Sequence, residues 1–202
     1  LGQAWRDNLD EIALDRQVDL VCFTGDLAFS GKPEQYREVG EAIELLLRTL
    51  NVDKSRFFCV PGNHDIDRSL EEDAWRQLRD ANDVRPEDFD PWIAGERVPR
   101  GCENAWLDAV FVRRRAYDDW LTTFGLDRLR PEHHRHGRLG YRITFAPGEI
   151  GNAAPLHIVG FDSAWLAGGG DAREQDNANL RLTREQVGRL LTDDHDAPLI
   201  GH

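Results

Sequence analysis

Short apolar runs alternate with amphipathic segments along the first third of the chain. Residues 19–24 and 57–60 form two runs with the length and composition of buried strands, and a glycine follows each within two residues. Amphipathic patterns cover residues 4–17 and 33–50, and Pro33 suits the first turn of a helix. This order of helix, strand, helix and strand predicts parallel strands joined by a crossover helix, with both strand ends at one edge of a sheet.

The pattern changes between residues 66 and 140. Apolar positions recur there at helical spacing in two stretches, which a linker rich in proline and charge separates at residues 83–91. We therefore expect a helical insertion that forms a cap over the site. Strand patterns resume at residues 139–145 and 156–165, and the next helix starts with the capping-box spacing of Thr183 and Gln186. One more apolar run, at residues 197–200, ends in Gly201 and His202.

Composition and charge narrow the class of protein. With 40% hydrophobic and 31% charged residues, the 202-residue chain is predicted to be one globular domain over residues 1–202. No apolar run approaches the roughly 20 residues that cross a bilayer, so we expect no membrane span and no signal peptide. The formal charge of −12 argues against constitutive electrostatic binding to the phosphate backbone of DNA or RNA. Three cysteines without a CxxC spacing fit neither a disulfide framework nor a zinc knuckle, and predict a cytoplasmic protein.

Polar side chains that can bind metals follow three of the predicted strands. Asp26, Asn63 and His202 each come directly after a glycine at the end of an apolar run. Carboxylate, amide and imidazole ligands suit divalent Mn, Fe, Zn or Ni. A bridging carboxylate can hold two such ions about 3.5–4 Å apart around a phosphoryl group. In that arrangement His64 is expected to act as a general acid or transition-state donor, with Asp65 orienting it.

Each candidate also has a structural interpretation. Asp26 could close a turn between strand and helix, Asn63 and His64 could belong to a Pro-Gly-Asn turn, and Asp65 could cap a helix. His202 stands alone after its glycine. The histidine cluster at residues 133–136 lies among charged residues, which favours a solvated loop over a metal site.

The motifs Gly25-Asp26 and Gly62-Asn63-His64-Asp65 together resemble those of the calcineurin-like metallophosphoesterases. Gly201-His202 is similar to the start of that family's next metal-binding segment. The resemblance implies that Asp26 bridges two divalent metal ions and that Asn63 and His202 bind the second one. It also implies that His64 sits over the scissile phosphate and that Asp65 supports it. The implied fold is α/β, a double β-sheet sandwich flanked by helices in four layers, with the region 66–140 as an insertion.

Two motifs of that family do not occur in these residues. Its first strand carries an Asp-x-His pair, which is absent before Trp5, and its Gly-His-x-His segment is cut after His202. The chain also lacks methionine and begins at Leu1. We therefore expect a trimmed form of a longer chain that lacks its first strand and its C-terminal part, the segments that hold most of the first metal in that family.

These observations predict hydrolysis of a phosphate ester by a binuclear metal centre. The expected substrate is a nucleotide, a cyclic nucleotide or a nucleic-acid phosphodiester. An alternative from another class is a catalytically incomplete domain that serves as a binding or scaffold module in a larger assembly. A third interpretation is a phosphoesterase domain fused to further domains. The flanking sequence discriminates between them, because an upstream Asp-x-His and a downstream Gly-His-x-His favour the enzyme.

Overall fold

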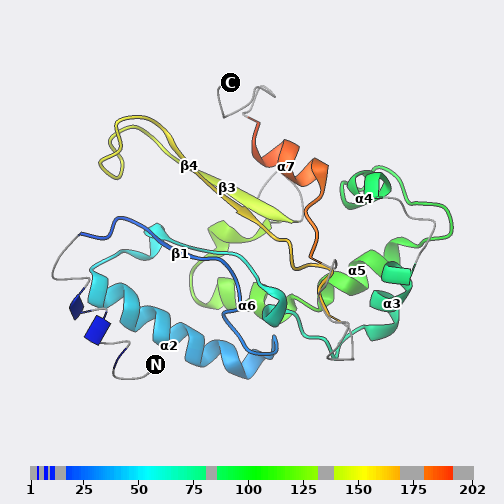
Figure 1. Ribbon diagram of the computed structural model, residues 1–202, viewed down its shortest axis with the longest axis horizontal. Helices are drawn as coiled ribbons and strands as arrows, with labels where there is room; N and C mark the ends of the chain where they lie inside the picture. Colours follow the sequence, from blue (N-terminus) through cyan, green and yellow to red (C-terminus); the bar gives the residue numbers. More distant parts are fainter. Residues whose placement is uncertain are drawn as a thin grey trace.

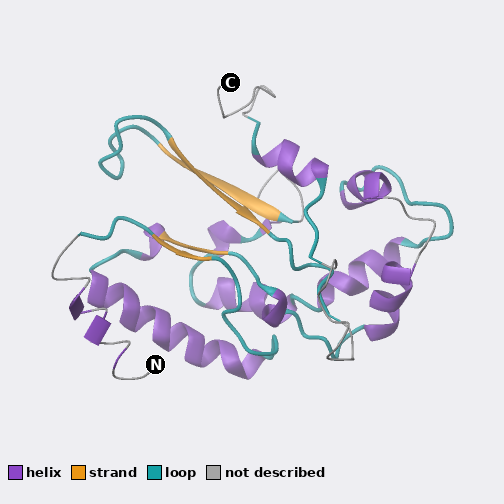
Figure 2. Ribbon diagram, in the orientation of Figure 1, coloured by secondary structure: helices purple, strands orange, loops and turns teal. Residues whose placement is uncertain are grey.

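A computed structural model describes residues 4, 7–8, 10–11, 17–80, 86–131, 139–168 and 180–192. Two pairs of strands lie at its centre with helices around them (Figure 1, Figure 2). β1 (Val21–Phe23) and β2 (Phe57–Cys59) pair in parallel, with Val21 opposite Phe57. α2 (Pro33–Leu50) connects them, which confirms the predicted strand-helix-strand unit. Of the helix predicted at 4–17, residues 4, 7–8 and 10–11 are helical and the others lie outside the described residues, except Gln17, which is not helical.

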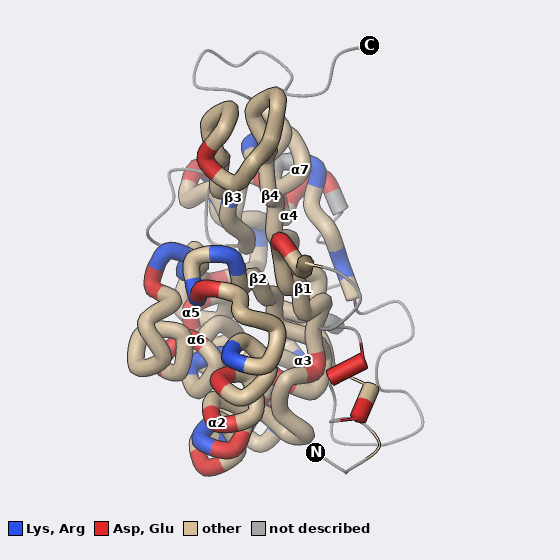
Figure 3. The backbone as a smooth tube through the Cα atoms, turned by 90° about the vertical axis from the view of Figure 1, so that its left-hand side faces the viewer, with Lys and Arg blue, Asp and Glu red and all other residues tan. Residues whose placement is uncertain are grey.

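The helix α2 follows directly from its sequence. Pro33 occupies its first turn, and Asn51 ends it in the left-handed conformation with φ of 52°. One face buries Tyr36, Ile43 and Leu47. The outer face carries acidic and basic residues side by side, as Figure 3 shows, which is typical of a solvated helix surface. The buried face is what fixes α2 beneath β1 and β2.

The second pair of strands is antiparallel. β3 (Gly140–Phe145) pairs with β4 (Leu156–Phe161), with Ile143 opposite Ile158. β4 ends earlier than the predicted 156–165 because the Asp162 carboxylate turns the chain by accepting the Ala164 N–H at 2.9 Å. Within the described residues the strands thus form two separate two-stranded sheets. The mixed α/β class is confirmed, whereas the four-layer sandwich stays a prediction.

The capping box predicted before the last helix is confirmed. α7 (Arg184–Leu190) begins after Thr183, whose hydroxyl accepts the Gln186 N–H at 3.1 Å. The Gln186 side chain accepts the Thr183 N–H in return, at 3.3 Å. Its amide also donates to the carbonyls of Leu139 and Asp162, so the start of α7 is tied to the ends of β3 and β4.

In its described part, the region 66–140 contains the α-helices α3 (Glu72–Asp80), α4 (Pro86–Ile93), α5 (Asn104–Val112) and α6 (Arg115–Thr123). The first three contribute to a second hydrophobic core, in which Trp75, Trp92 and Trp165 are buried. α6 instead packs on α2, where Trp120 stacks on Tyr36 with ring centroids 5.7 Å apart. One part of the predicted insertion, α6, therefore packs in the hydrophobic core around α2. The role of the region 66–140 as a cap over the site stays a prediction. No helix in the described ranges is long and apolar enough to cross a membrane.

Candidate active site

The turns after β1 and β2 lie against each other. Because the two strands are parallel and in register, both end at the same edge, where Phe23 O accepts the Val60 N–H at 3.1 Å. Gly25, with φ of 126°, then brings the backbone so close that a Cβ on it would lie 2.8 Å from the Gly62 Cα. The polar residues that follow each strand therefore meet, as the sequence predicts.

Asp26 is held in an unusual conformation by this contact. Its φ is 55°, in the left-handed region that few residues other than glycine adopt. The carboxylate packs on Gly62 so tightly that a Cβ there would overlap its Oδ1 atom. The same Oδ1 accepts the backbone N–H of His64 at 3.1 Å. The turn after β1 thus presses its aspartate onto the turn that carries the Gly62-Asn63-His64-Asp65 motif.

Asp65 joins the two turns from the inside. It is fully buried in η2 (Asn63–Asp65), a single 3₁₀ turn. Its carboxylate accepts the N–H groups of Leu27, Ala28 and Gly62 at 3.1, 2.8 and 2.9 Å. It also accepts the hydroxyl of Tyr36 in α2 at 2.9 Å. Burial raises the pKa of Asp65, and these donors offset only part of that rise.

A second set of contacts fixes the loop between Asp26 and α2. The Gln35 Oε1 atom accepts the Ser30 N–H at 3.0 Å. A Cβ on Gly31, whose φ is 66°, would lie 2.5 Å from the Asp67 nitrogen, so this part of the loop packs closely against the chain after η2. Lys32 Nζ donates to Asp67 Oδ1 at 2.8 Å. The loop is consequently anchored on both sides of its midpoint.

The His64 ring is oriented by a backbone carbonyl. Its Nδ1 lies 2.7 Å from Phe29 O. A carbonyl can only accept, so Nδ1 carries the proton and Nε2 is the nitrogen left to face a substrate. The Phe29 ring lies beside the imidazole, with centroids 5.7 Å apart. The Asp65 carboxylate, expected to orient His64, contacts the loop and Tyr36, and its support of His64 stays a prediction.

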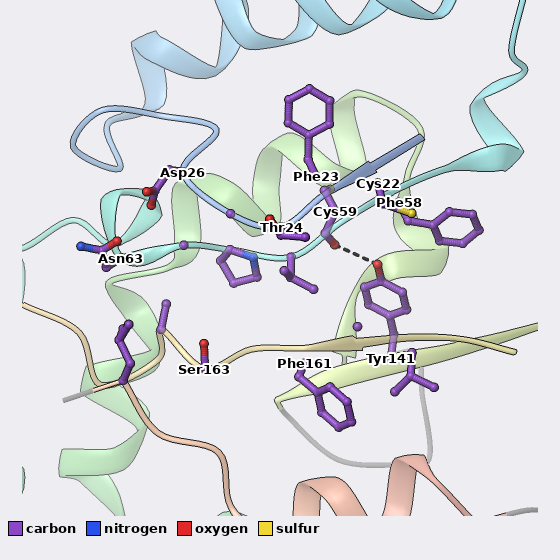
Figure 4. A pocket seen from close by; sticks show the side chains of 18 of the residues that line it. Cys22, Phe23, Thr24, Asp26, Phe58, Cys59, Asn63, Tyr141, Phe161 and Ser163 are labelled. Carbon is purple, nitrogen blue, oxygen red and sulfur yellow. Dashed lines mark hydrogen bonds between the residues drawn. The ribbon is translucent and has the colours of Figure 1, made fainter. Parts of the chain in front are cut away.

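A cavity of about 510 Å³ is lined by residues of both strand pairs. Figure 4 shows Asp26 and Asn63 at one end of it, with Ser163 from the segment after β4 also lining the wall. Tyr141 of β3 lines the other end and donates its hydroxyl to Cys59 O at 3.0 Å. His64 is not among the described residues that line the cavity, so its ring lies beside the Asp26 end rather than inside it.

A buried ion pair fixes the segment that carries Ser163. Arg114 Nη1 lies 2.5 Å from Asp162 Oδ2, and both side chains are almost completely buried. Burial raises the pKa of Asp162, although Arg114 opposes this. Arg114 also contacts Asp118 in α6 at 3.1 Å. The residue after Asp162 is therefore positioned from α6, a connection between elements that are distant in sequence.

The oxygen donors at the end of the cavity fit part of a metal site. Asp26 offers a carboxylate and Asn63 an amide oxygen, both of which suit hard or borderline divalent cations. His202, the third expected ligand, lies outside the described residues. Over the described ranges, no group of three or more histidine, cysteine and acidic side chains could hold a metal ion. Two of the three expected ligands are thus brought together.

Some residues of the site were not found by sequence reasoning. Tyr36 belongs to the apolar face of the amphipathic pattern at 33–50, which gives no sign that its hydroxyl reaches Asp65. Phe29 lies between the strand predicted at 19–24 and the helix predicted at 33–50, and it contacts His64 through both its carbonyl and its ring. A signal was available, because Leu27, Ala28 and Phe29 form an apolar stretch in a segment predicted to be a loop, where glycine and polar residues are the usual ones.

Comparison with known proteins adds a family assignment. A family model described as calcineurin-like phosphoesterase matches residues 3–189. A probable glycerophosphodiester phosphodiesterase, GpdQ, of Arcobacter nitrofigilis is 35% identical over 86 residues. That alignment covers 41% of this chain and 29% of the relative, so the chain spans less than a third of the curated relative. No solved structure matches.

Proposed function

Because the chain belongs to the calcineurin-like phosphoesterase family, we propose that it hydrolyses phosphate esters at the cavity end where Asp26 and Asn63 lie. The observation that carries the proposal is the contact between the turns after β1 and β2. It places a carboxylate, an amide oxygen and an imidazole on adjacent backbone segments. Polar groups from separate segments that meet at a pocket are the arrangement expected of an active site.

Asp26 and Asn63 are the residues proposed to hold divalent cations, with His202 as a further ligand from outside the described residues. Bound cations supply Lewis-acid activation of the phosphoryl group and of a water nucleophile. The Asp26 carboxylate already receives one hydrogen bond, from the His64 N–H, which restricts its orientation. Gly62, which packs on Asp26 and donates its N–H to the Asp65 carboxylate, stabilises this orientation of Asp26.

His64 is proposed to donate a proton to the leaving-group oxygen. With Nδ1 directed at Phe29 O, only Nε2 can reach a substrate, and it can donate when the imidazole is doubly protonated. Nδ1 thus holds the ring in position, and Nε2 delivers the proton. Asp65 is a positioning residue, since it acts on the loop that carries Asp26 and Phe29.

A phosphodiester is the proposed substrate class. The matched relative is named as a probable glycerophosphodiester phosphodiesterase, which favours a diester over a monoester. The formal charge of −12 disfavours a long polyanion held by its backbone, so a small diester is preferred to an extended nucleic acid. Cyclic nucleotides fall within this class, because their phosphate carries two ester bonds.

The test uses the full-length protein with saturating Mn²⁺ and measures kcat/KM on bis(4-nitrophenyl) phosphate and 4-nitrophenyl phosphate. Asp26→Asn and His64→Gln should each lower kcat/KM by roughly 10²-fold or more. Asp19→Asn and His157→Gln are matched controls, because Asp19 is exposed at the far end of β1 and His157 lies outside the cavity lining. Losses below about tenfold in both site variants would contradict the proposal, and so would bound metal that is unchanged in Asp26→Asn.

A further inference from the structure

Phe29 is unusually exposed to solvent for a large apolar residue. Of the surface of this residue 79% is accessible, the highest value for a large apolar residue in the described part of the chain. The next highest is Leu182 at 50%. Phenylalanine is usually buried, and covering such a ring with another apolar group is favourable. A ligand that covers Phe29 therefore gains binding free energy from this contact.

The backbone that carries this ring is anchored on both sides. Asp65 accepts the N–H groups of Leu27 and Ala28 on one side of Phe29. Gln35 accepts the N–H of Ser30 on the other side. Binding to a surface that is already fixed loses less conformational entropy than binding to a mobile one. The exposure of Phe29 is thus a property of an anchored loop.

The ring also lies next to the group proposed to protonate the leaving-group oxygen. The Phe29 and His64 centroids are 5.7 Å apart and their planes are tilted by 35°. His64 Nδ1 donates to the carbonyl of Phe29, so the same residue both orients the imidazole and carries the exposed phenyl ring. The organic group of an ester whose oxygen binds at His64 Nε2 would start close to the Phe29 ring, because the two rings are neighbours.

We propose that Phe29 determines specificity as a platform for a planar aromatic group attached to the phosphate through the ester oxygen. This rests on the proposed function, since it places the phosphate at the Asp26 end of the cavity. Aromatic rings and nucleobases stack on phenylalanine, whereas a small polar group such as glycerol gains little there. The protein therefore favours aryl or base-bearing esters over aliphatic ones.

The binding test uses two phosphonates that cannot be hydrolysed as esters. Benzylphosphonate places a CH₂ group where an aryl ester has its oxygen, and ethylphosphonate lacks the ring. Both are titrated calorimetrically into the full-length protein with saturating Mn²⁺. Phe29→Ala should weaken benzylphosphonate about tenfold, the usual scale of one ring contact, and ethylphosphonate less than twofold. Phe29→Tyr keeps the ring and should bind like the wild type.

Val112→Ala, which truncates an exposed apolar residue on α5, is the matched control and should change neither affinity. Thermal unfolding checks that Phe29→Ala is folded. Equal weakening of both phosphonates, or of neither, overturns the proposal, as does a change in oligomeric state that accounts for the effect. Selective binding in a protein that fails to hydrolyse any ester would leave the platform standing and remove the proposed function.

Discussion

Replacing Asp65 by asparagine tests how the two turns are joined. The carboxylate accepts four hydrogen bonds, from Ala28 and Tyr36 on Oδ1 and from Leu27 and Gly62 on Oδ2. An amide keeps only one acceptor atom. The least damaging orientation places the asparagine NH₂ group at the Oδ1 position. There the Tyr36 hydroxyl can turn and accept a hydrogen bond from the NH₂ group, so that only the Ala28 N–H is left without an acceptor. One buried donor without an acceptor, plus weaker remaining bonds, gives an expected loss of about 2–4 kcal/mol.

The assay is urea unfolding at neutral pH with and without Mn²⁺, and Tyr36→Phe isolates one of the four bonds. Tyr36→Phe alone should lose about 1–2 kcal/mol. Because the hydroxyl changes from donor to acceptor in Asp65→Asn, the two substitutions should deviate from additivity by at least about 0.5 kcal/mol. Asp19→Asn, at an exposed position, should stay within about 0.5 kcal/mol of the wild type. A similarly small effect of Asp65→Asn, or strict additivity, would refute the reasoning.

Three further outcomes are expected. Gly62→Ala should displace the Asp26 carboxylate, because the new methyl group overlaps it, and should lower both Mn²⁺ affinity and kcat/KM by at least about tenfold, measured by calorimetry and initial rates. Burial tends to raise the pKa of Asp67, but hydrogen bonds from Lys32 and Ser69 prevail and lower it. The folded state then binds fewer protons than the unfolded state, so the Asp67 carboxylate contributes to the free energy of unfolding above about pH 4. This contribution is lost as the pH falls through the lowered pKa, and urea unfolding at several pH values should show that Asp67→Asn lacks it. Chelation should abolish activity and lower the unfolding temperature, and Mn²⁺ should restore both.

The first half of the fold could be predicted because its signals are local. The apolar runs before Gly25 and Gly62, and Pro33 between them, define β1, α2 and β2 with no knowledge of distant contacts. The ends of strands were less certain. β4 stops at Phe161 because the side chain of Asp162 turns the chain and pairs with Arg114, 48 positions away. A sequence pattern does not contain that pairing.

The site divides in the same way. Asp26 and Asn63 could be placed together because parallel strands in one sheet end at one edge, and the structure brings both to one end of the cavity. The partners of Asp65 could not be foreseen, since they come from backbone groups of another turn and from Tyr36 in α2. The same holds for Phe29, whose carbonyl meets His64 only after the loop has folded.

The contact between Gly25 and Gly62 has a consequence for anyone who transplants or redesigns this centre. The space between the two turns admits no additional carbon atom, so each turn determines the shape that the other can take. Grafting one of them onto a foreign scaffold would leave the aspartate without the surface that bends it into place. The smallest portable unit is therefore both turns, the crossover helix between them and the inward carboxylate that ties them together.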